Sequence, residues 1–247
     1  VLKSTGKDFI RLTQYEYLTA SDQSRGEAPP EMEMPYRGAG PVIHLPKTWT
    51  LKHSALMLDD TITGRRSIRR FSTAPLALDE LSWLLWCSQG VQKVIAPSTI
   101  RTVPSAGARH PLDTFVLLNR VKGIQPGLYR FLAIEHAIAP IELSTQVSSK
   151  LQAACLEQDM VVTASATFFW VADVYRSAWR YSERAWRYVF LDAGHACQNL
   201  YLGAASADCG VCAIAAFDDA KLNKLLGVDG ENQFAVYAAV VGKLPAR

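Results

Sequence analysis

The chain has 247 residues, 49% of them hydrophobic and 20% charged, which is typical of a globular protein with one sizeable core. Its formal net charge of +3 falls well short of the clustered Lys/Arg surface of nucleic-acid-binding proteins. No stretch reaches the roughly 18 uninterrupted apolar residues of a membrane-spanning helix. We therefore expect neither a nucleic acid nor a membrane as a partner.

Residues 1–50 differ in composition from the rest of the chain. They have little sustained hydrophobic periodicity, and they contain Pro29, Pro30, Pro35, Pro41 and Pro46. This pattern predicts an N-terminal arm that wraps a main domain formed by residues 51–247.

The segments that follow predict a mixture of helices and strands. A helix from about residue 51 is expected to end near Gly64, because glycine tolerates the left-handed conformation that terminates helices. A second helix is expected over residues 79–89, and a loop follows it. The further predicted elements are a strand over 114–121, a hairpin of 127–133 and 136–141, a helix over 144–157 and a buried strand over 166–174.

Residues 177–207 contain no proline or central turn signal and predict one helix of about thirty residues. Its residues are small or apolar on more than one face, and one domain of this size hardly supplies a partner for each face. A homodimer interface along this helix is therefore expected. The chain is then expected to continue as a loop over 210–219, a short helix over 219–227 and a closing strand over 234–242, which together indicate an α+β fold.

Four arginines and a serine follow the first predicted helix within six positions: Arg65, Arg66, Ser67, Arg69 and Arg70. Guanidinium groups hold a phosphate through bidentate, charge-assisted hydrogen bonds. A solvated basic turn has the same composition, so the segment alone leaves both interpretations open.

Two other segments place small residues in turns. Residues 104–107 (PSAG) and residues 213–218 offer backbone amides to a planar ligand without side-chain obstruction. Asp218 is a predicted helix cap. Together with the arginines, these segments predict a site for one flat anionic cofactor.

Five motifs in this order carry a resemblance to a known family: RRSIRRF (65–71), VPSAGARHPLD (103–113), GLYRF (127–131) with the downstream His136, RYSERAWRYVFLDAGHACQNLYLGAA (180–205) and GVCAIAAFDD (210–219). The chain resembles the FMN-dependent nitroreductase superfamily. Within it, the chain is similar to the SagB-type or McbC-like dehydrogenases, which oxidise azoline rings in ribosomal peptide natural products. The resemblance covers about residues 51–243.

The resemblance implies a central mixed or antiparallel sheet flanked by helices, a long central helix at a homodimer interface, and two FMN between the subunits. It implies that Arg65, Arg66 and Ser67 bind the FMN phosphate and ribityl group. Arg69 would lie near the N1/C2 edge of the flavin, where a cation raises the reduction potential. The remaining implied contacts are Pro104, Ser105, Ala106 and Gly107 from the other subunit, the amides of Ala215 and Ala216 near N5 and O4, and Lys243 as a further phosphate candidate.

In the azoline-oxidising branch a Lys-Tyr pair is taken to act as the base, and the matching residues here are Arg180 and Tyr181. An arginine, with a pKa above about 12, does not act as a general base at neutral pH. Tyr181 is a candidate for positioning the substrate or acting as an acid, with Arg180 lowering its pKa or holding a carboxylate. An ordinary helix-surface role for both residues stays open.

The resemblance favours oxidation of an azoline-like or other C–N substrate, small molecule or peptide, with hydride transfer through flavin N5. An NAD(P)H-dependent reductase of nitroaromatics or quinones is one alternative. A non-enzymatic, flavin-holding scaffold for a peptide-modifying complex is another. No GxGxxG follows a strand and no GxxxxGK[ST] occurs, so NAD(P)H would visit the flavin transiently.

The cysteines give a second set of candidates. Cys209 and Cys212 (CGVC) have the spacing of a redox pair, but Cys209 is expected at the end of the long helix, where the helix dipole opposes a thiolate. A zinc site that adds His195 and Cys197 is disfavoured, because side chains two apart on a helix point away from each other. We therefore expect no metal. Five cysteines, mostly in apolar segments, favour reduced thiols in a soluble cytoplasmic protein.

Overall fold

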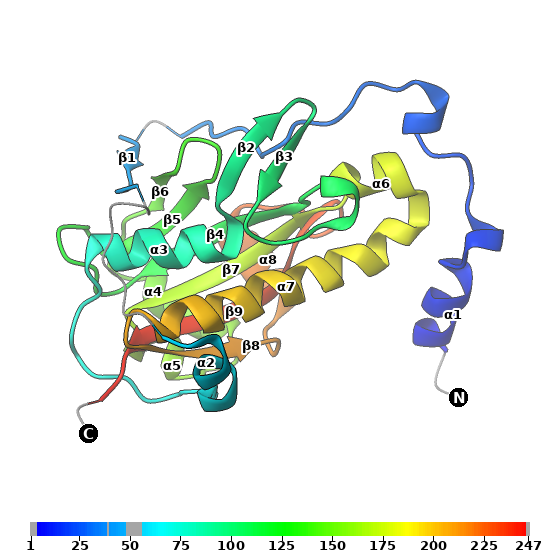
Figure 1. Ribbon diagram of the computed structural model, residues 1–247. Helices are drawn as coiled ribbons and strands as arrows, with labels where there is room; N and C mark the ends of the chain where they lie inside the picture. The colour runs from blue at the N-terminus through cyan, green and yellow to red at the C-terminus, as the bar shows by residue number, and fades with distance from the viewer. Residues whose placement is uncertain (1–3, 39, 48–55, 246–247) are drawn as a thin grey trace.

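A seven-stranded antiparallel sheet forms the centre of the computed structural model, which describes residues 4–38, 40–47 and 56–245 (Figure 1). The strand order is β1-β6-β5-β4-β7-β9-β8. The strands are β1 (Ile43–His44), β4 (Leu112–Leu118), β5 (Gly127–Leu132), β6 (Ala137–Glu142), β7 (Ala166–Asp173), β8 (Cys209–Ile214) and β9 (Gln233–Lys243).

Helices cover both faces of this sheet (Figure 1). On one face, α3 (Leu78–Gln89) and α7 (Ala185–Ala205) form a core with alternate residues of the central strands, such as Trp170. On the other face lie α4 (Val147–Ala154), α5 (Met160–Thr163) and α8 (Asp219–Leu226). Because the sheet is covered on both sides, β4 is buried throughout, and its sequence is apolar apart from Asp113 and Thr114. The α+β fold, with an antiparallel sheet flanked by helices, is confirmed.

Most of the predicted elements are confirmed to within a few residues, including α3, the β5–β6 hairpin, β7, α8 and β9. Helix α2 (Leu58–Gly64) ends at the predicted glycine, but it begins later than predicted, because residues 56 and 57 are not helical and Met57 is extended. Residue 51 itself lies outside the described residues. The loop expected after residue 90 instead contains a separate hairpin of β2 (Val91–Ile95) and β3 (Ser98–Arg101).

The single helix predicted over residues 177–207 is wrong. It is broken into α6 (Tyr175–Tyr181), the single turn η5 (Ser182–Arg184) and α7. The break is at Ser182, where φ is 49°. Neither proline nor glycine marks it, but the N-terminal arm packs beside it, and the Trp179 indole N–H donates a hydrogen bond to the Glu27 carbonyl (3.0 Å). A tertiary contact therefore accompanies a break that local sequence does not predict.

The loop predicted over residues 210–219 is also wrong in its first half. Residues 209–214 form β8, an edge strand that pairs with the closing strand β9, with Val211 opposite Val241. Cys209 therefore begins a strand, and it does not end the long helix.

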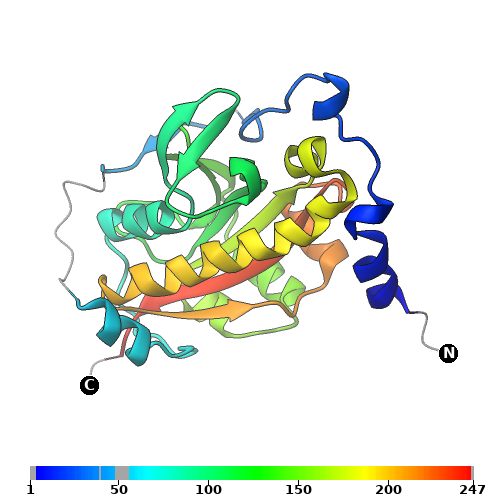
Figure 2. The same ribbon diagram turned by 45° about the vertical axis from the view of Figure 1, so that its right-hand side comes forward.

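The N-terminal arm contains α1 (Thr5–Leu12), η1 (Tyr15–Tyr17), η2 (Gln23–Arg25) and β1, which joins the sheet beside β6. It leads from α1, beside the start of α7, past α6 and the β2–β3 hairpin to the edge of the sheet (Figure 2). Its middle part is held by three buried arginines that donate hydrogen bonds to arm carbonyls: Arg101 and Arg176 to Met32 (3.4 and 3.5 Å), and Arg130 to Met34 and Pro35.

Candidate functional site

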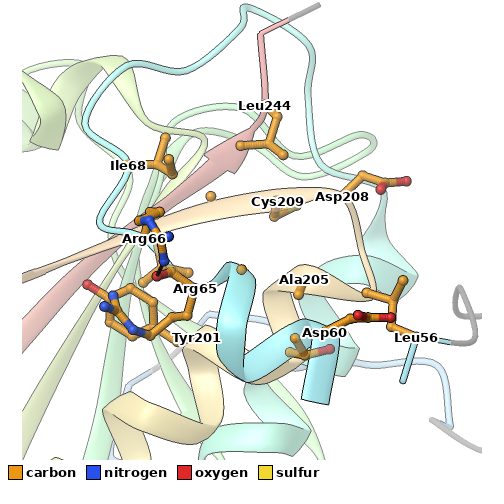
Figure 3. Close-up of a pocket in the computed structure, with 14 residues that line it drawn as sticks. Leu56, Asp60, Arg65, Arg66, Ile68, Tyr201, Ala205, Asp208, Cys209 and Leu244 are labelled. Carbon is orange, nitrogen blue, oxygen red and sulfur yellow. Dashed lines mark hydrogen bonds between the residues drawn. The ribbon is translucent and has the colours of Figure 1, made fainter. Parts of the chain in front are cut away.

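A cavity of about 360 Å³ lies between α2, the basic segment that follows it, and β8 (Figure 3). Arg65 and Arg66 line it. The basic segment is held against the sheet edge because Ser67 forms a parallel bridge with Val211, whose carbonyl also accepts a hydrogen bond from the Ile68 amide (2.8 Å). This contact fixes the backbone of the arginines beside the cavity.

Tyr201, near the C-terminal end of α7, connects three parts of this site. Its hydroxyl lies 3.2 Å from Ser67 Oγ and accepts a hydrogen bond from the Ala213 amide (2.9 Å). The Arg65 guanidinium lies 5.4 Å from the centre of its ring, within cation–π range. Sequence reasoning placed Tyr201 only on an apolar helix face and missed this role. The available signal was its hydroxyl, which needs a partner when it is partly buried.

The arginines at this cavity carry uncompensated charge. Within the described part of the chain, no carboxylate lies within 4.0 Å of the charged groups of Arg65, Arg66 or Arg69. Arg66 instead donates hydrogen bonds to the carbonyls of Thr63 and Arg65 (3.0 and 2.8 Å). Two acidic residues, Asp60 and Asp208, also line the cavity; neither forms an ion pair with Arg65 or Arg66, and Asp208 lies on the far side of the cavity from Arg66 (Figure 3). The side of the arginines is therefore suited to bind an anion.

The other predicted contacts on this side are at opposite ends of β8. Ala215 and Ala216 follow its last residue and are exposed, and the Ala216 carbonyl accepts a hydrogen bond from Gln158 (2.9 Å). Lys243 lies opposite Cys209 at the other end. Its ammonium group donates hydrogen bonds to the Glu80 carboxylate and to the Ala207 carbonyl (2.7 Å for the carbonyl), so it already has an anionic partner.

A second group of predicted residues meets at the end of α6. Gly107 has a φ of 56°, and a Cβ atom added to it would lie 2.4 Å from the Tyr181 hydroxyl and 3.2 Å from Arg180 Cδ. The structure thus brings the PSAG loop (residues 104–107) against the Arg180–Tyr181 pair. A glycine suits this position both for its left-handed backbone and for the close approach.

Asp192, on α7, contacts the same loop and was missed by sequence analysis. The residue is 5% exposed, and its Oδ2 has no hydrogen-bond partner among the described residues. Burial raises the pKa of Asp192 to about 6, although the neighbouring Ser105 hydroxyl, the charge of His195 and the Ala106 amide act in the opposite direction. The signal in the sequence was an acidic residue on a helix that is otherwise small or apolar on several faces.

Most of the predicted site residues, together with Tyr201 and Asp192, therefore form two clusters along α7. The arginine cluster (Arg65, Arg66, Ser67 and Tyr201) lies near the C-terminal end of the helix, and the loop cluster (residues 104–107, Arg180, Tyr181 and Asp192) lies near its N-terminal end. A helix of 21 residues is about 30 Å long. Within one chain the structure brings together the members of each cluster, but it does not bring the two clusters into contact. That residues 104–107 serve the other subunit stays a prediction.

The two cysteines of the CGVC motif are buried and unpaired in β8. Burial raises the pKa of Cys209 to about 12 and also raises that of Cys212, which disfavours the reactive thiolate. In the described ranges no three His, Cys, Asp or Glu side chains are grouped so that they could hold a metal ion. None of the described helices combines the length and apolar character needed to cross a membrane.

Comparison with known sequences gives two kinds of relative. The family model described as "Nitroreductase family" matches residues 62–243. A protein of Methanocaldococcus jannaschii that is named a nitroreductase is 34% identical over 173 residues, covering 70% of this chain and 85% of that protein. The trifolitoxin-processing protein TfxB of Rhizobium leguminosarum bv. trifolii is 28% identical over 145 residues, covering 57% of this chain and 34% of TfxB.

Three solved structures have similar folds. One from Ralstonia eutropha, also named a nitroreductase, has a TM-score of 0.67 and 25% identity and covers 83% of this chain and 90% of its own. The NADPH:FMN oxidoreductase of Vibrio harveyi complexed with NAD+ has a TM-score of 0.55 and 17% identity, covering 76% and 69%. A chain in the E. coli microcin synthetase McbBCD complex with truncated pro-MccB17 bound has a TM-score of 0.62 and 17% identity. It covers 98% of this chain and 93% of its own, so this likeness extends over the N-terminal arm.

Proposed function

Because this chain belongs to the nitroreductase family of oxidoreductases, we propose that it is an FMN-dependent dehydrogenase of the SagB/McbC-like branch. It acts as a homodimer and oxidises an azoline-like or other C–N bond, most simply one carried by a peptide. The five unpaired thiols support the expected reducing, cytoplasmic location.

The observation that carries this proposal is the uncompensated charge of the arginine cluster at a cavity of about 360 Å³. Arg65, Arg66 and Ser67 would hold the FMN phosphate there by charge-assisted hydrogen bonds. Arg69, exposed at the same edge, would face the flavin ring, and its charge would favour the reduced cofactor. The amides of Ala215 and Ala216, two exposed residues, would face N5 and O4 of the flavin. Lys243 would reach a phosphate only by leaving Glu80. A bound flavin would supply the hydride acceptor at N5.

The proposed homodimer is supported by the exposed face of α7 between the two clusters. Phe190 and Leu191 are 52% and 58% exposed there, and Gly194, one turn on, has open space where a side chain would be. Apolar or small residues at this spacing form one stripe along a helix. A second copy packed along the stripe would bring its own PSAG loop towards the first copy's cavity. One flavin would then use the arginine cluster of one subunit and the loop cluster of the other.

The choice of branch is supported by a structural likeness that includes the N-terminal arm and by the names of two similar proteins. The chain from the microcin synthetase complex covers 98% of this chain, compared with 76% for the NADPH:FMN oxidoreductase. TfxB is named for processing of trifolitoxin. A peptide substrate is accordingly our proposal for this chain as well.

Within the loop cluster, Tyr181 is the residue we propose to meet the substrate, as a positioning group or an acid. Its hydroxyl lies against the backbone of Gly107. Arg180 replaces the lysine of the branch, and because it stays protonated it would orient an anionic group of the substrate rather than accept a proton.

A reductase of nitroaromatics or quinones is the second candidate, since the fold is also that of an NADPH:FMN oxidoreductase. One anaerobic absorbance experiment separates the candidates. For the dehydrogenase, we expect purified protein to show oxidised-flavin bands that persist after NADH or NADPH is added and bleach with a thiazoline- or oxazoline-containing peptide. Bands that bleach with NADPH would favour the reductase. Bands that persist with every substrate would favour a scaffold, and no bands after FMN is supplied would refute flavin binding.

A further inference from the structure

A second cavity, of about 180 Å³, lies between the N-terminal arm and the elbow at which α6 meets α7. Figure 2 shows the arm passing beside this elbow. We define the elbow as residues 180–184. It contributes Arg180, Tyr181 and Arg184 to the cavity, and the arm contributes Tyr15, Thr19 and Ser21. The cavity is thus lined by the same Arg180–Tyr181 pair that the proposed function places at the substrate.

The elbow carries two arginines, Arg180 and Arg184, whose guanidinium groups form no ion pair within the described residues. Glu183 is the single acidic residue between positions 175 and 191. Among the residues that the structure describes, no carboxylate lies within 4.0 Å of the Arg180 or Arg184 guanidinium. Arg184 donates hydrogen bonds to neutral groups only, the Tyr188 hydroxyl (3.1 Å) and the Thr13 carbonyl (2.9 Å). The residues that line the cavity therefore include two arginines, both from the elbow, and no acidic residue.

The arm side of the cavity supplies hydroxyl groups, and the charge of Arg184 affects the pKa of one of them, Tyr15. Thr19 Oγ1 lies 3.3 Å from Ser182 Oγ at the elbow. The pKa of Tyr15 is lowered by its hydrogen bond with Tyr188 and by the positive charge of Arg184, whose guanidinium lies 4.4 Å from the centre of the Tyr15 ring. An anion in the cavity would thus meet guanidinium groups from the elbow and hydroxyl donors from the arm.

The cavity has room for one residue-sized group of a substrate. Its volume of 180 Å³ equals the share of roughly six water molecules at about 30 Å³ each. The planar fork of a guanidinium matches a carboxylate in bidentate geometry.

We propose, resting on the function proposed above, that this cavity binds a carboxylate of the peptide substrate, held by Arg180 and Arg184 with hydroxyl donors from the arm. The carboxylate is either the C-terminus of the peptide or an Asp or Glu side chain. The N-terminal arm is on this view a wall of the substrate site, and it selects acidic substrates.

The test measures binding to the full-length protein as purified, by ligand-observed NMR, with four small probes. N-acetylalanine carries a terminal carboxylate and N-acetylalaninamide carries none. N-acetylaspartamide with a free side-chain carboxylate and N-acetylasparaginamide form the second pair. We expect at least one acid to bind about tenfold more tightly than its amide, a difference of about 1.4 kcal/mol, since hydrogen bonds to charged groups are stronger than those to neutral ones. The pair that shows the difference identifies the source of the carboxylate.

Variants then assign the binding to this cavity. Arg180→Gln and Arg184→Gln should each weaken the acid about tenfold and remove most of its advantage over the amide, and Thr19→Val should weaken it about threefold. Arg184→Gln also loses the hydrogen bond to the Thr13 carbonyl of the arm. Within the described residues Arg180 donates no hydrogen bond to an arm carbonyl, so Arg180→Gln tests the carboxylate site without disturbing the arm. Lys224→Gln, an exposed cation on α8, is the control and should bind the acid normally.

Equal binding of acid and amide in both pairs, or binding unchanged by Arg180→Gln and Arg184→Gln, would overturn the proposal. The binding measurement does not require catalytic turnover, so a negative result for the carboxylate site can be distinguished from a negative result for the proposed function. Acid-selective binding by a protein that takes up no flavin would reject the function and keep the carboxylate site. Flavin chemistry without acid selectivity would reject the carboxylate site alone.

Discussion

Arg65 and Arg66 show how the backbone presets a binding group before any ligand arrives. Arg66 is oriented by hydrogen bonds to two carbonyls at the end of α2, and Arg65 rests over the ring of Tyr201. Neither guanidinium has to leave a carboxylate to meet a phosphate. Binding of a phosphate by these two guanidinium groups therefore does not have to offset the loss of an existing ion pair.

We expect the double substitution of Arg65 and Arg66 by alanine to abolish FMN retention. Two charge-assisted hydrogen-bonding groups, each worth about 1.5–3 kcal/mol, correspond together to at least a hundredfold loss of affinity. The measurement is the ratio of flavin to protein absorbance after gel filtration, followed by titration with FMN. Lys224→Gln removes one exposed charge elsewhere and should stay yellow. A double variant that keeps its full flavin content would remove this segment from the site.

Asp192 gives the loop cluster a measurable dependence on pH. Its pKa is raised to about 6 by burial, compared with about 3.9 in an unfolded chain. Between these values the folded state binds more protons than the unfolded state, so this group lowers the free energy of unfolding as pH rises from about 4 to about 6. The contribution of the neutral acid is present at low pH and is lost above pH 6.

We expect Asp192→Asn, which cannot ionise, to gain roughly 2 kcal/mol relative to the parent between pH 4 and pH 7. Urea unfolding at four pH values across this range checks the change. Asp229→Asn provides a control of opposite sign, because hydrogen bonds from the Gln233 and Glu231 amides lower the pKa of Asp229. Its carboxylate stabilises the fold above the unfolded pKa, so that variant should lose stability towards neutral pH. A parallel pH response of Asp192→Asn and the parent would contradict the assignment.

At the scale of elements, the basic segment depends on a close approach to β8 at Gly210. A Cβ atom added there would lie 2.7 Å from the Cβ of Ile68, a position that a side-chain rotation cannot relieve. The segment would have to move away from the strand, and the hydrogen bond from the Ile68 amide to Val211 would be lost.

We therefore expect Gly210→Ala to weaken FMN binding at least tenfold and to lower stability by about 1–3 kcal/mol, the usual range for overpacking. FMN titration and urea unfolding measure the two effects separately. Gly6→Ala in α1, where a new Cβ meets nothing within 4 Å, is the matched substitution; it should leave FMN affinity unchanged and should not lower stability, because alanine favours a helix more than glycine does. Unaltered FMN affinity in Gly210→Ala would show that the segment tolerates displacement.

The elements that sequence predicted well are those whose local pattern agrees with their packing. Helix α8 begins after its predicted cap Asp218, whose carboxylate accepts a hydrogen bond from the Lys221 amide (3.0 Å). It ends before Gly227, which has a φ of 73°. The elements that were missed depend on distant partners. Strand β8 is six small or apolar residues that become a strand by pairing with β9, and the break at Ser182 accompanies contacts with the arm. Local pattern carries no record of either partner.

The same distinction applies to the site. The arginines and the PSAG loop were recognisable because charge and glycine are conspicuous in sequence. Tyr201 and Asp192 were not, because each lies on an apolar helix and acts through tertiary contacts. Tyr201 forms hydrogen bonds with Ser67 and Ala213, and Asp192 lies against Ser105 and Ala106 of the PSAG loop. Their roles appear only once α7 is placed between the two clusters.

At the scale of the whole molecule, α7 is the element that relates the two clusters. Its buried face packs on the sheet, while Phe190 and Leu191 project from the opposite side. A monomer would leave this stripe in water and would leave each cluster without the other. A homodimer would bury the stripe and complete two sites at once, so oligomeric state and flavin content should change together.

We expect Leu191→Arg to convert the proposed homodimer to a monomer and to lose most of its FMN in the same step. An arginine at the centre of an apolar interface leaves a buried charge unpaired in both subunits, a cost of several kcal/mol. Light scattering with in-line absorbance at 280 and about 450 nm gives mass and flavin content for each species. Leu156→Arg replaces a leucine that is 57% exposed near α4, away from the stripe, and should remain a yellow dimer. A Leu191→Arg monomer with full flavin content would mean that one chain completes the site alone, and the PSAG loop would then have to serve the cavity of its own subunit.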